Sequence, residues 1–173
     1  MRCSLPSPTR FACSLALAAA LAGPAPVAAQ DEALVGELAR LIALADARQF
    51  DPAVFRAGTG SPDALVRRQT AYAVAWVGDR AGTALLVPLL QDPDTAVRAA
   101  AAFGLGLLKD PAGVVPLSQL VRQTPDVQQT EVHAEAVTAI AKIGGETGAN
   151  ALAQIIAGGT ADPSRPGTAL SRA

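Results

Sequence analysis

Three segments of this chain repeat the same apolar pattern in phase. They begin at Val66, Val97 and Val132 and align with one another without gaps. Their starts are separated first by 31 residues and then by 35. Repeats of this length are typical of stacked supersecondary units, because a single unit cannot bury its own apolar face. This recurrence therefore constrains the fold more than any other feature.

Each repeat reads as two helices joined by a short turn. In the first helix, small or apolar residues recur at steps of three to five residues, which places them on one helical face. In the second helix, the spacing i, i+3, i+4 again marks one stripe. The matched positions are Ala71, Ala102 and Val137; Val74, Leu105 and Ile140; Val77, Leu108 and Ile143; then Leu86, Leu117 and Leu152; Leu89, Leu120 and Ile155; Leu90, Val121 and Ile156.

Glycines and prolines lie at positions that affect where the predicted helices begin, end and pack. Gly78 and Gly144 follow a first helix, which is the usual place for glycine after a helix C-terminus. Lys109 stands at that place in the second copy and departs from the rule. Pro88 predicts a kink in its helix or a helix that starts late. Pro116 lies near a helix start, where a missing N–H costs little. Gly104 and Gly106 fall inside a helix, where we expect them to permit close packing.

Composition supports an all-α fold. Only 3% of the residues are aromatic and half are apolar, so the core must be built mainly from Ala, Val, Leu and Ile. No run with the period-two alternation of a strand is present. The net charge is −1, and the sequence has no basic stripe of the kind that nucleic-acid binding requires.

The first residues resemble a targeting segment. Arg2 and Arg10 precede an apolar run over 11–22, and the small residues 27–29 follow. This order predicts a secretory signal peptide over 1–29, cleaved after Ala29, and a periplasmic or secreted protein. An uncleaved membrane anchor is the alternative, although a span needs about 20 apolar residues. Cys3 and Cys13 both lie in this segment, so the mature chain would hold no disulfide and no thiolate metal site.

The two ends of the repeat array differ. The apolar pattern of Leu34, Leu38, Leu41 and Ile42 predicts a helix over 31–50, within a capping helix pair at 30–60. Residues 158–173 show no periodicity and are predicted to be a disordered tail. With no polar cap visible at the C-terminal end, either an apolar edge is exposed and promotes self-association, or more protein follows.

The repeats resemble HEAT repeats, particularly the short kind found in phycobilisome lyases. The resemblance rests on Asp92-Pro93-Asp94, Val97-Arg98 and the segment 105–108, with matching residues in the other copies. It implies a right-handed α-solenoid of stacked antiparallel helix pairs, with about three repeats over 61–157. Most proteins of the family are scaffolds or binding surfaces, and a minority are enzymes. The hydroxylating enzymes of the family need paired His-Glu iron ligands, whereas this chain has one histidine.

Several charged residues have a structural and a functional interpretation. Arg67 and Arg98 share a repeat position, where they could form an anion site or, as we favour, a ladder of hydrogen bonds to loop aspartates such as Asp63, Asp94 or Asp79. His133 replaces the arginine in the third copy. It could serve as a proton relay or a metal ligand, but we interpret it as a surface residue, since no second ligand apart from Glu131 and Glu135 lies at helical spacing. No metal, cofactor or catalytic constellation is predicted.

Candidate partner-binding residues come from two places. Tyr72 and Trp76 lie one helical turn apart, where they could anchor a partner, since Trp and Tyr dominate binding hot spots. They could also pack beneath the N-terminal cap, which we favour. In HEAT-like solenoids the second helices line the inner surface. The solvent-facing residues expected there are Pro88, Gln91, Ser118, Gln119, Arg122 and Gln154.

These observations predict an exported scaffold that binds a protein or peptide and is not itself an enzyme. No membrane association is expected after signal cleavage. The alternatives are the repeat portion of a larger exported enzyme, for example one that carries a prolyl isomerase domain, or a lyase-like HEAT protein.

Overall fold

The computed structural model describes residues 27–123 and 130–159, and all regular structure in these ranges is helical. The predicted all-α class is therefore confirmed. Two short 3-10 turns, η2 (Arg80–Gly82) and η3 (Pro111–Gly113), precede α5 and α7. The helices are α2 (Val27–Asp46), α3 (Pro52–Thr59), α4 (Ala64–Val77), α5 (Thr83–Leu89), α6 (Thr95–Leu108), α7 (Val114–Gln123), α8 (Thr130–Ile143) and α9 (Gly145–Gly159).

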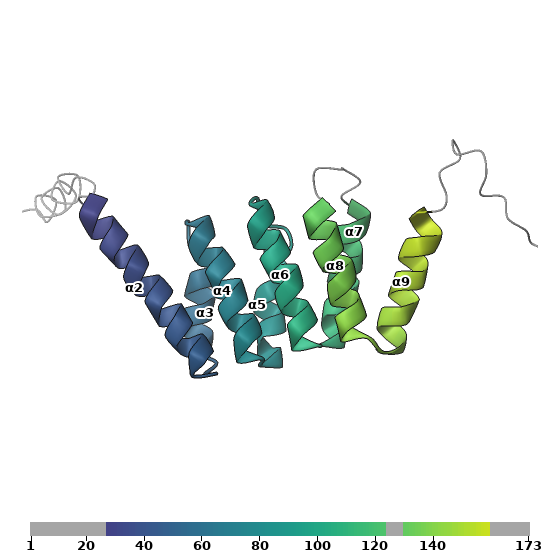
Figure 1. The fold of residues 1–173 in the computed structure, drawn as a ribbon, viewed down its shortest axis with the longest axis horizontal. Helices are drawn as coiled ribbons and strands as arrows, with labels where there is room; N and C mark the ends of the chain where they lie inside the picture. The colour runs from purple at the N-terminus through teal and green to yellow at the C-terminus, as the bar shows by residue number, and fades with distance from the viewer. Residues whose placement is uncertain (1–26, 124–129, 160–173) are drawn as a thin grey trace, which may run out of the picture. The chain divides into compact units, whose positions relative to one another are not determined.

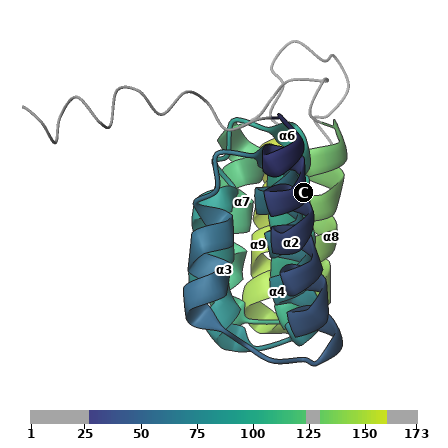
Figure 2. The same ribbon diagram turned by 90° about the vertical axis from the view of Figure 1, so that its left-hand side faces the viewer.

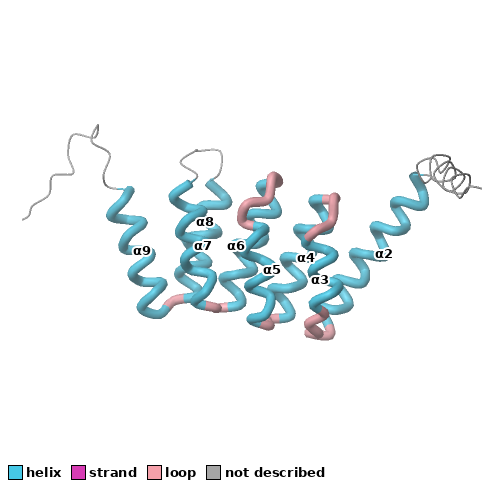
Figure 3. Tube along the Cα trace, turned by 180° about the vertical axis from the view of Figure 1, so that it is seen from behind, coloured by secondary structure: helices cyan, strands magenta, loops and turns pink. Residues whose placement is uncertain are grey.

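The chain divides into two compact units, residues 1–36 and 37–173. In the first unit the structure describes only the N-terminal half of α2. In the second, α4, α6 and α8 pack side by side in one layer (Figure 1). Behind them lie α3, α5 and α7, followed by α9 (Figures 2 and 3). These stacked helix pairs form an all-α solenoid, as predicted.

The three in-phase valines occupy equivalent positions. Val66, Val97 and Val132 are each completely buried, at the same place in α4, α6 and α8. Eight residues later, on the same face of each helix, Val74, Leu105 and Ile140 are also fully buried. They continue the core from one repeat to the next. The recurrence in the sequence thus corresponds to a continuous core.

Equivalent residues also end the first helices. Gly78, Lys109 and Gly144 follow α4, α6 and α8, and all three have a left-handed backbone, with φ of 78°, 49° and 66°. Lys109 therefore departs from the glycine rule in residue type but not in conformation. Since left-handed backbone is unfavourable for a residue with a Cβ, Lys109 adopts it at a conformational cost.

Gly106 permits the close approach of α6 and α8. A Cβ added to Gly106 would lie 2.9 Å from the Cα of Ala139 and 3.0 Å from its Cβ. A Cβ on Gly104 would lie 2.8 Å from Leu86 Cδ1. The predicted packing role of both glycines is confirmed.

The predicted bond from a repeat arginine to a loop aspartate is present at Arg67, but with a different partner, whereas Arg98 donates to the carbonyl oxygens of Asp92 and Pro93. Arg67 pairs with Asp92 in the loop before α6, with Nε 2.7 Å from Oδ2. The suggested partners Asp63, Asp94 and Asp79 were wrong, because these side chains cap the N-termini of α4, α6 and η2 instead. Among the described aspartates near the repeat boundaries, only Asp92 is buried.

Two further expectations need correction. The helix predicted over 31–50 begins earlier, at Val27, and ends at Asp46, since Arg48 turns the chain with a φ of 49°. The helix that contains Pro88 does not start late, because α5 begins at Thr83 and Pro88 is its second-last residue. Pro116 lies in the first turn of α7, as expected. The signal segment, apart from the start of α2, and residues 160–173 of the predicted tail lie outside the described residues.

Candidate functional site

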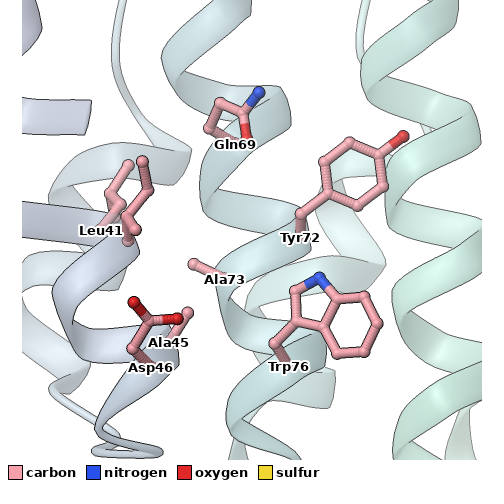
Figure 4. A pocket seen from close by; sticks show the side chains of 8 residues that line it. Leu41, Ala45, Asp46, Gln69, Tyr72, Ala73 and Trp76 are labelled. Carbon is pink, nitrogen blue, oxygen red and sulfur yellow. The ribbon is translucent and has the colours of Figure 1, made fainter. Parts of the chain in front are cut away.

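Tyr72 and Trp76 line a cleft between α4 and the C-terminal half of α2. The cleft has a volume of about 260 Å³ (Figure 4). Apolar side chains make up most of its wall, and Asp46 places a carboxylate at its edge (Figure 4). The lining residues are Leu41, Ile42, Ala45 and Asp46 from α2, and Gln69, Tyr72, Ala73 and Trp76 from α4.

The two aromatic residues also contact the next repeat. The ring centroid of Phe103 in α6 is 5.8 Å from that of Tyr72 and 6.5 Å from that of Trp76, both with edge-on geometry. Lys142 of α8 places its Nζ 5.0 Å from the Phe103 centroid, in a cation–π contact. Residues from three successive repeats therefore meet around the ring of Phe103.

Trp76 is 56% exposed, so our preference for its packing beneath the cap was wrong. Its contacts with Phe103 fix one side of the indole, while the remaining surface faces solvent at the cleft. Ile42, on the opposite wall, is also exposed, at 58%. A half-exposed indole beside an apolar cleft has the properties of a binding hot spot.

A second hollow lies between α7 and α9, and we call it the α7–α9 groove. Its volume is about 420 Å³. It brings together three residues that the sequence singled out, Ser118, Arg122 and Gln154. The full lining is Val114, Val115, Ser118, Arg122, Glu146, Thr147, Asn150, Ala151 and Gln154.

Ser118 was expected to face solvent and instead is buried. Its side chain turns back along the helix, and its Oγ donates a hydrogen bond to the Val114 carbonyl at 2.8 Å. The hydroxyl is therefore already satisfied, and the small side chain leaves room at the bottom of the groove.

The other predicted residues lie near the groove without lining it. Gln91 is exposed after α5, and its Nε2 donates to Gln123 Oε1 at 3.4 Å. Gln119 is exposed on α7, and Pro88 lies in a separate apolar hollow between α5 and α7. Thr147 and Asn150 also line the groove but were not predicted from the sequence. Their spacing of i, i+3 and i+7 with Gln154 places all three on one helix face, which could have identified them.

Neither surface has the residues of a metal centre. Among the described residues, no group of three His, Cys, Asp or Glu side chains could hold a metal ion. His133 is half-buried on α8, directly after the core residue Val132. Within 27–123 and 130–159, no helix has both the length and the apolar character that crossing a bilayer requires.

Comparison with known families agrees with this geometry. The sequence model described as HEAT repeats matches residues 52–134 and, in a second register, residues 83–167. This chain belongs to the HEAT repeat family. The match begins at Pro52, the first residue of α3. No curated protein matches the chain significantly. HEAT repeats commonly mediate protein–protein interaction.

Proposed function

We propose that this HEAT protein is an exported scaffold that binds another protein and does not itself catalyse a reaction. The observation that carries the proposal is the exposed indole of Trp76 beside the α2–α4 cleft. Large aromatic side chains lose little conformational freedom on binding and bury much apolar surface, so they contribute strongly to affinity.

The arrangement of the cluster supports this role. Phe103 contacts the rings of Tyr72 and Trp76 edge-on, and contacts that restrict a side chain before binding reduce the entropy it loses on binding. Asp46 is exposed at the rim, where a carboxylate would favour a partner with a basic residue near its apolar anchor.

Binding is tested with the purified protein and Trp76→Ala. Photo-crosslinking in a periplasmic extract identifies a partner, which is then purified and titrated. We expect the Trp76→Ala change to weaken binding at least tenfold, in the range of hot-spot substitutions. Ile156→Ala is the matched control, because Ile156 is also exposed, at 68%, but lies on α9. Equal affinity of the two variants and the wild type would contradict the proposed surface, as would turnover of a substrate by the purified protein alone.

Export is tested separately with a reporter. The proposal rests on the basic start, apolar run and small residues of segment 1–29. Alkaline phosphatase fused after residue 60 should be active in a bacterial host, since this enzyme needs an oxidising compartment for its disulfides. The same fusion without residues 1–29 should be inactive. Equal activity of the two fusions would rule out a signal in this segment.

A further inference from the structure

We infer that the α7–α9 groove binds an extended segment of a partner protein that carries an acidic and a basic side chain about four residues apart. This inference rests on the proposed binding function and adds the chemistry of the ligand. It concerns a different surface from the Trp76 cleft, so the two can be tested independently.

The α9 wall of the groove is polar along its length. Thr147, Asn150, Ala151 and Gln154 follow the spacing i, i+3, i+4, i+7 and therefore share one face of the helix. Asn150 and Gln154 are exposed, and neither amide hydrogen-bonds to another residue in the described part of the chain. A helix face that served only to pack against α7 would instead be apolar.

Free amides match the requirements of an extended peptide. Each side-chain amide offers both donors and an acceptor, so it can pair with the N–H and C=O groups that an extended backbone leaves open. The groove also has room for a backbone, because Ser118 and Ala151 contribute only small side chains. A ligand that is already helical has satisfied most of its backbone groups and would gain little from these amides.

Opposite charges occupy the two ends of the groove. Glu146 lies in the first turn of α9 and Arg122 in the last turn of α7, and both line the groove together with Gln154. Both are exposed, and neither forms a salt bridge with another described residue. A ligand with a basic group near Glu146 and an acidic group near Arg122 would complement both ends.

The dimensions set the spacing of the ligand's charges. Glu146 and Gln154 are about 12 Å apart along α9, at about 1.5 Å per residue. An extended chain covers this length in about four residues, at about 3.3 Å each. A helical ligand with charges four residues apart would separate them by only about 6 Å. The groove therefore selects an extended segment over a helix with the same sequence.

The balanced charge of the groove disfavours nucleic acid. Arg122 is the one cation among the described residues that line it, and Glu146 would repel a phosphate backbone. A single-stranded oligonucleotide serves as a competitor in the experiment, and its displacement of a bound peptide would overturn the inference.

The probe is a fluorescein-labelled peptide, Gly-Ser-Glu-Thr-Val-Thr-Lys-Ser-Gly, acetylated and amidated so that its ends carry no charge. Its Thr-Val-Thr centre favours extended structure. Fluorescence anisotropy measures binding to the purified protein. We expect saturable binding of this peptide to the wild type. The Arg122→Glu variant should bind it about fivefold more weakly, and binding to this variant should be restored when lysine replaces the glutamate of the peptide. Arg40→Glu is the matched control, since Arg40 is an exposed arginine on α2.

The results separate this inference from the proposed function. Trp76 is the only tryptophan of the chain, so its emission reports on the α2–α4 cleft alone. A peptide in the groove should leave that emission unchanged. No saturable binding by the wild type, equal binding by Arg122→Glu, or a shift of the Trp76 emission would each overturn the inference. Loss of partner binding in Trp76→Ala would still support the proposed function in any of these cases.

Discussion

Arg67 and Asp92 form a two-point ion pair between consecutive repeats, from Nε to Oδ2 at 2.7 Å and from Nη2 to Oδ1 at 2.9 Å. Only 13% of the Arg67 side chain and 5% of the Asp92 side chain are exposed. Such parallel bonds fix the geometry as well as adding energy. This pair is therefore the strongest polar link that the described residues provide between the first two repeats.

Asp92→Asn should destabilise the fold by about 2 to 3 kcal/mol. The substitution removes the charge that compensates a largely buried guanidinium, and breaking such a pair is costly because one charge remains uncompensated. Urea unfolding followed by circular dichroism measures the effect. Glu37→Gln is the control, since Glu37 is an exposed acid on α2, and it should change stability by less than about 0.5 kcal/mol. Equal stabilities of the two variants would show that the pair contributes nothing.

The same pair makes stability depend on pH. The hydrogen bonds that Arg67 donates to Asp92 lower the pKa of the Asp92 carboxyl below its ordinary value of 3.8. A carboxyl group with a lowered pKa in the folded state contributes stability that is fully present above its unfolded pKa and is lost as the pH falls through the folded one. Between pH 7 and pH 3, the free energy of unfolding should therefore fall more for the wild type than for Asp92→Asn. Parallel curves for the two proteins would contradict this assignment.

Gly106→Ala should destabilise the contact between α6 and α8 by about 2 kcal/mol. The new methyl group would lie within 2.9 Å of the Ala139 backbone, which cannot move without shifting α8, and overpacking typically costs 1 to 3 kcal/mol. Thermal unfolding provides the measurement. Gly36→Ala is the matched control, because a Cβ there meets nothing within 4 Å and alanine favours the helix. A Gly106→Ala protein as stable as Gly36→Ala would show that α6 and α8 are further apart.

Lys109→Gly should stabilise the protein by about 0.5 to 1 kcal/mol. It relieves the left-handed strain at the end of α6, and this gain exceeds the added freedom of glycine in the unfolded chain. Lys109→Ala removes the charge but keeps a Cβ, so it should give no gain. Chemical denaturation of the three proteins tests the order. Stabilisation by both substitutions would assign the effect to the lysine charge instead.

The sequence was sufficient to predict the repeat architecture because burial imposes a period. The phase of Val66, Val97 and Val132 predicted equivalent core positions, and all three are fully buried. The partner of Arg67 could not be predicted in the same way. Several aspartates lie in the loops near Arg67, and which one turns inward depends on loop conformation, for which no periodic signal exists.

The candidate surfaces were predictable only in part, for a related reason. Helical spacing placed Ser118 and Arg122 on one side of α7, but the short side chain of Ser118 folds back onto the helix and is buried, whereas the long side chain of Arg122, in the last turn, is exposed. Trp76 was expected to pack beneath the N-terminal cap, with partner binding as the alternative. Its exposure follows from the position of α2, which leaves a cleft rather than a sealed contact beside α4.

Arg67 also bonds backward along the chain, since its Nη1 donates to the carbonyl oxygens of Ser61 at 2.9 Å and Pro62 at 3.0 Å. One guanidinium thus joins the loop that enters the first repeat to the loop that enters the second. Solenoids usually lose their terminal repeats one at a time, because each contacts only its neighbours. Here the first step of such unravelling must release both loops at once, so amide hydrogens in α4 and α6 should exchange with solvent through a shared opening event.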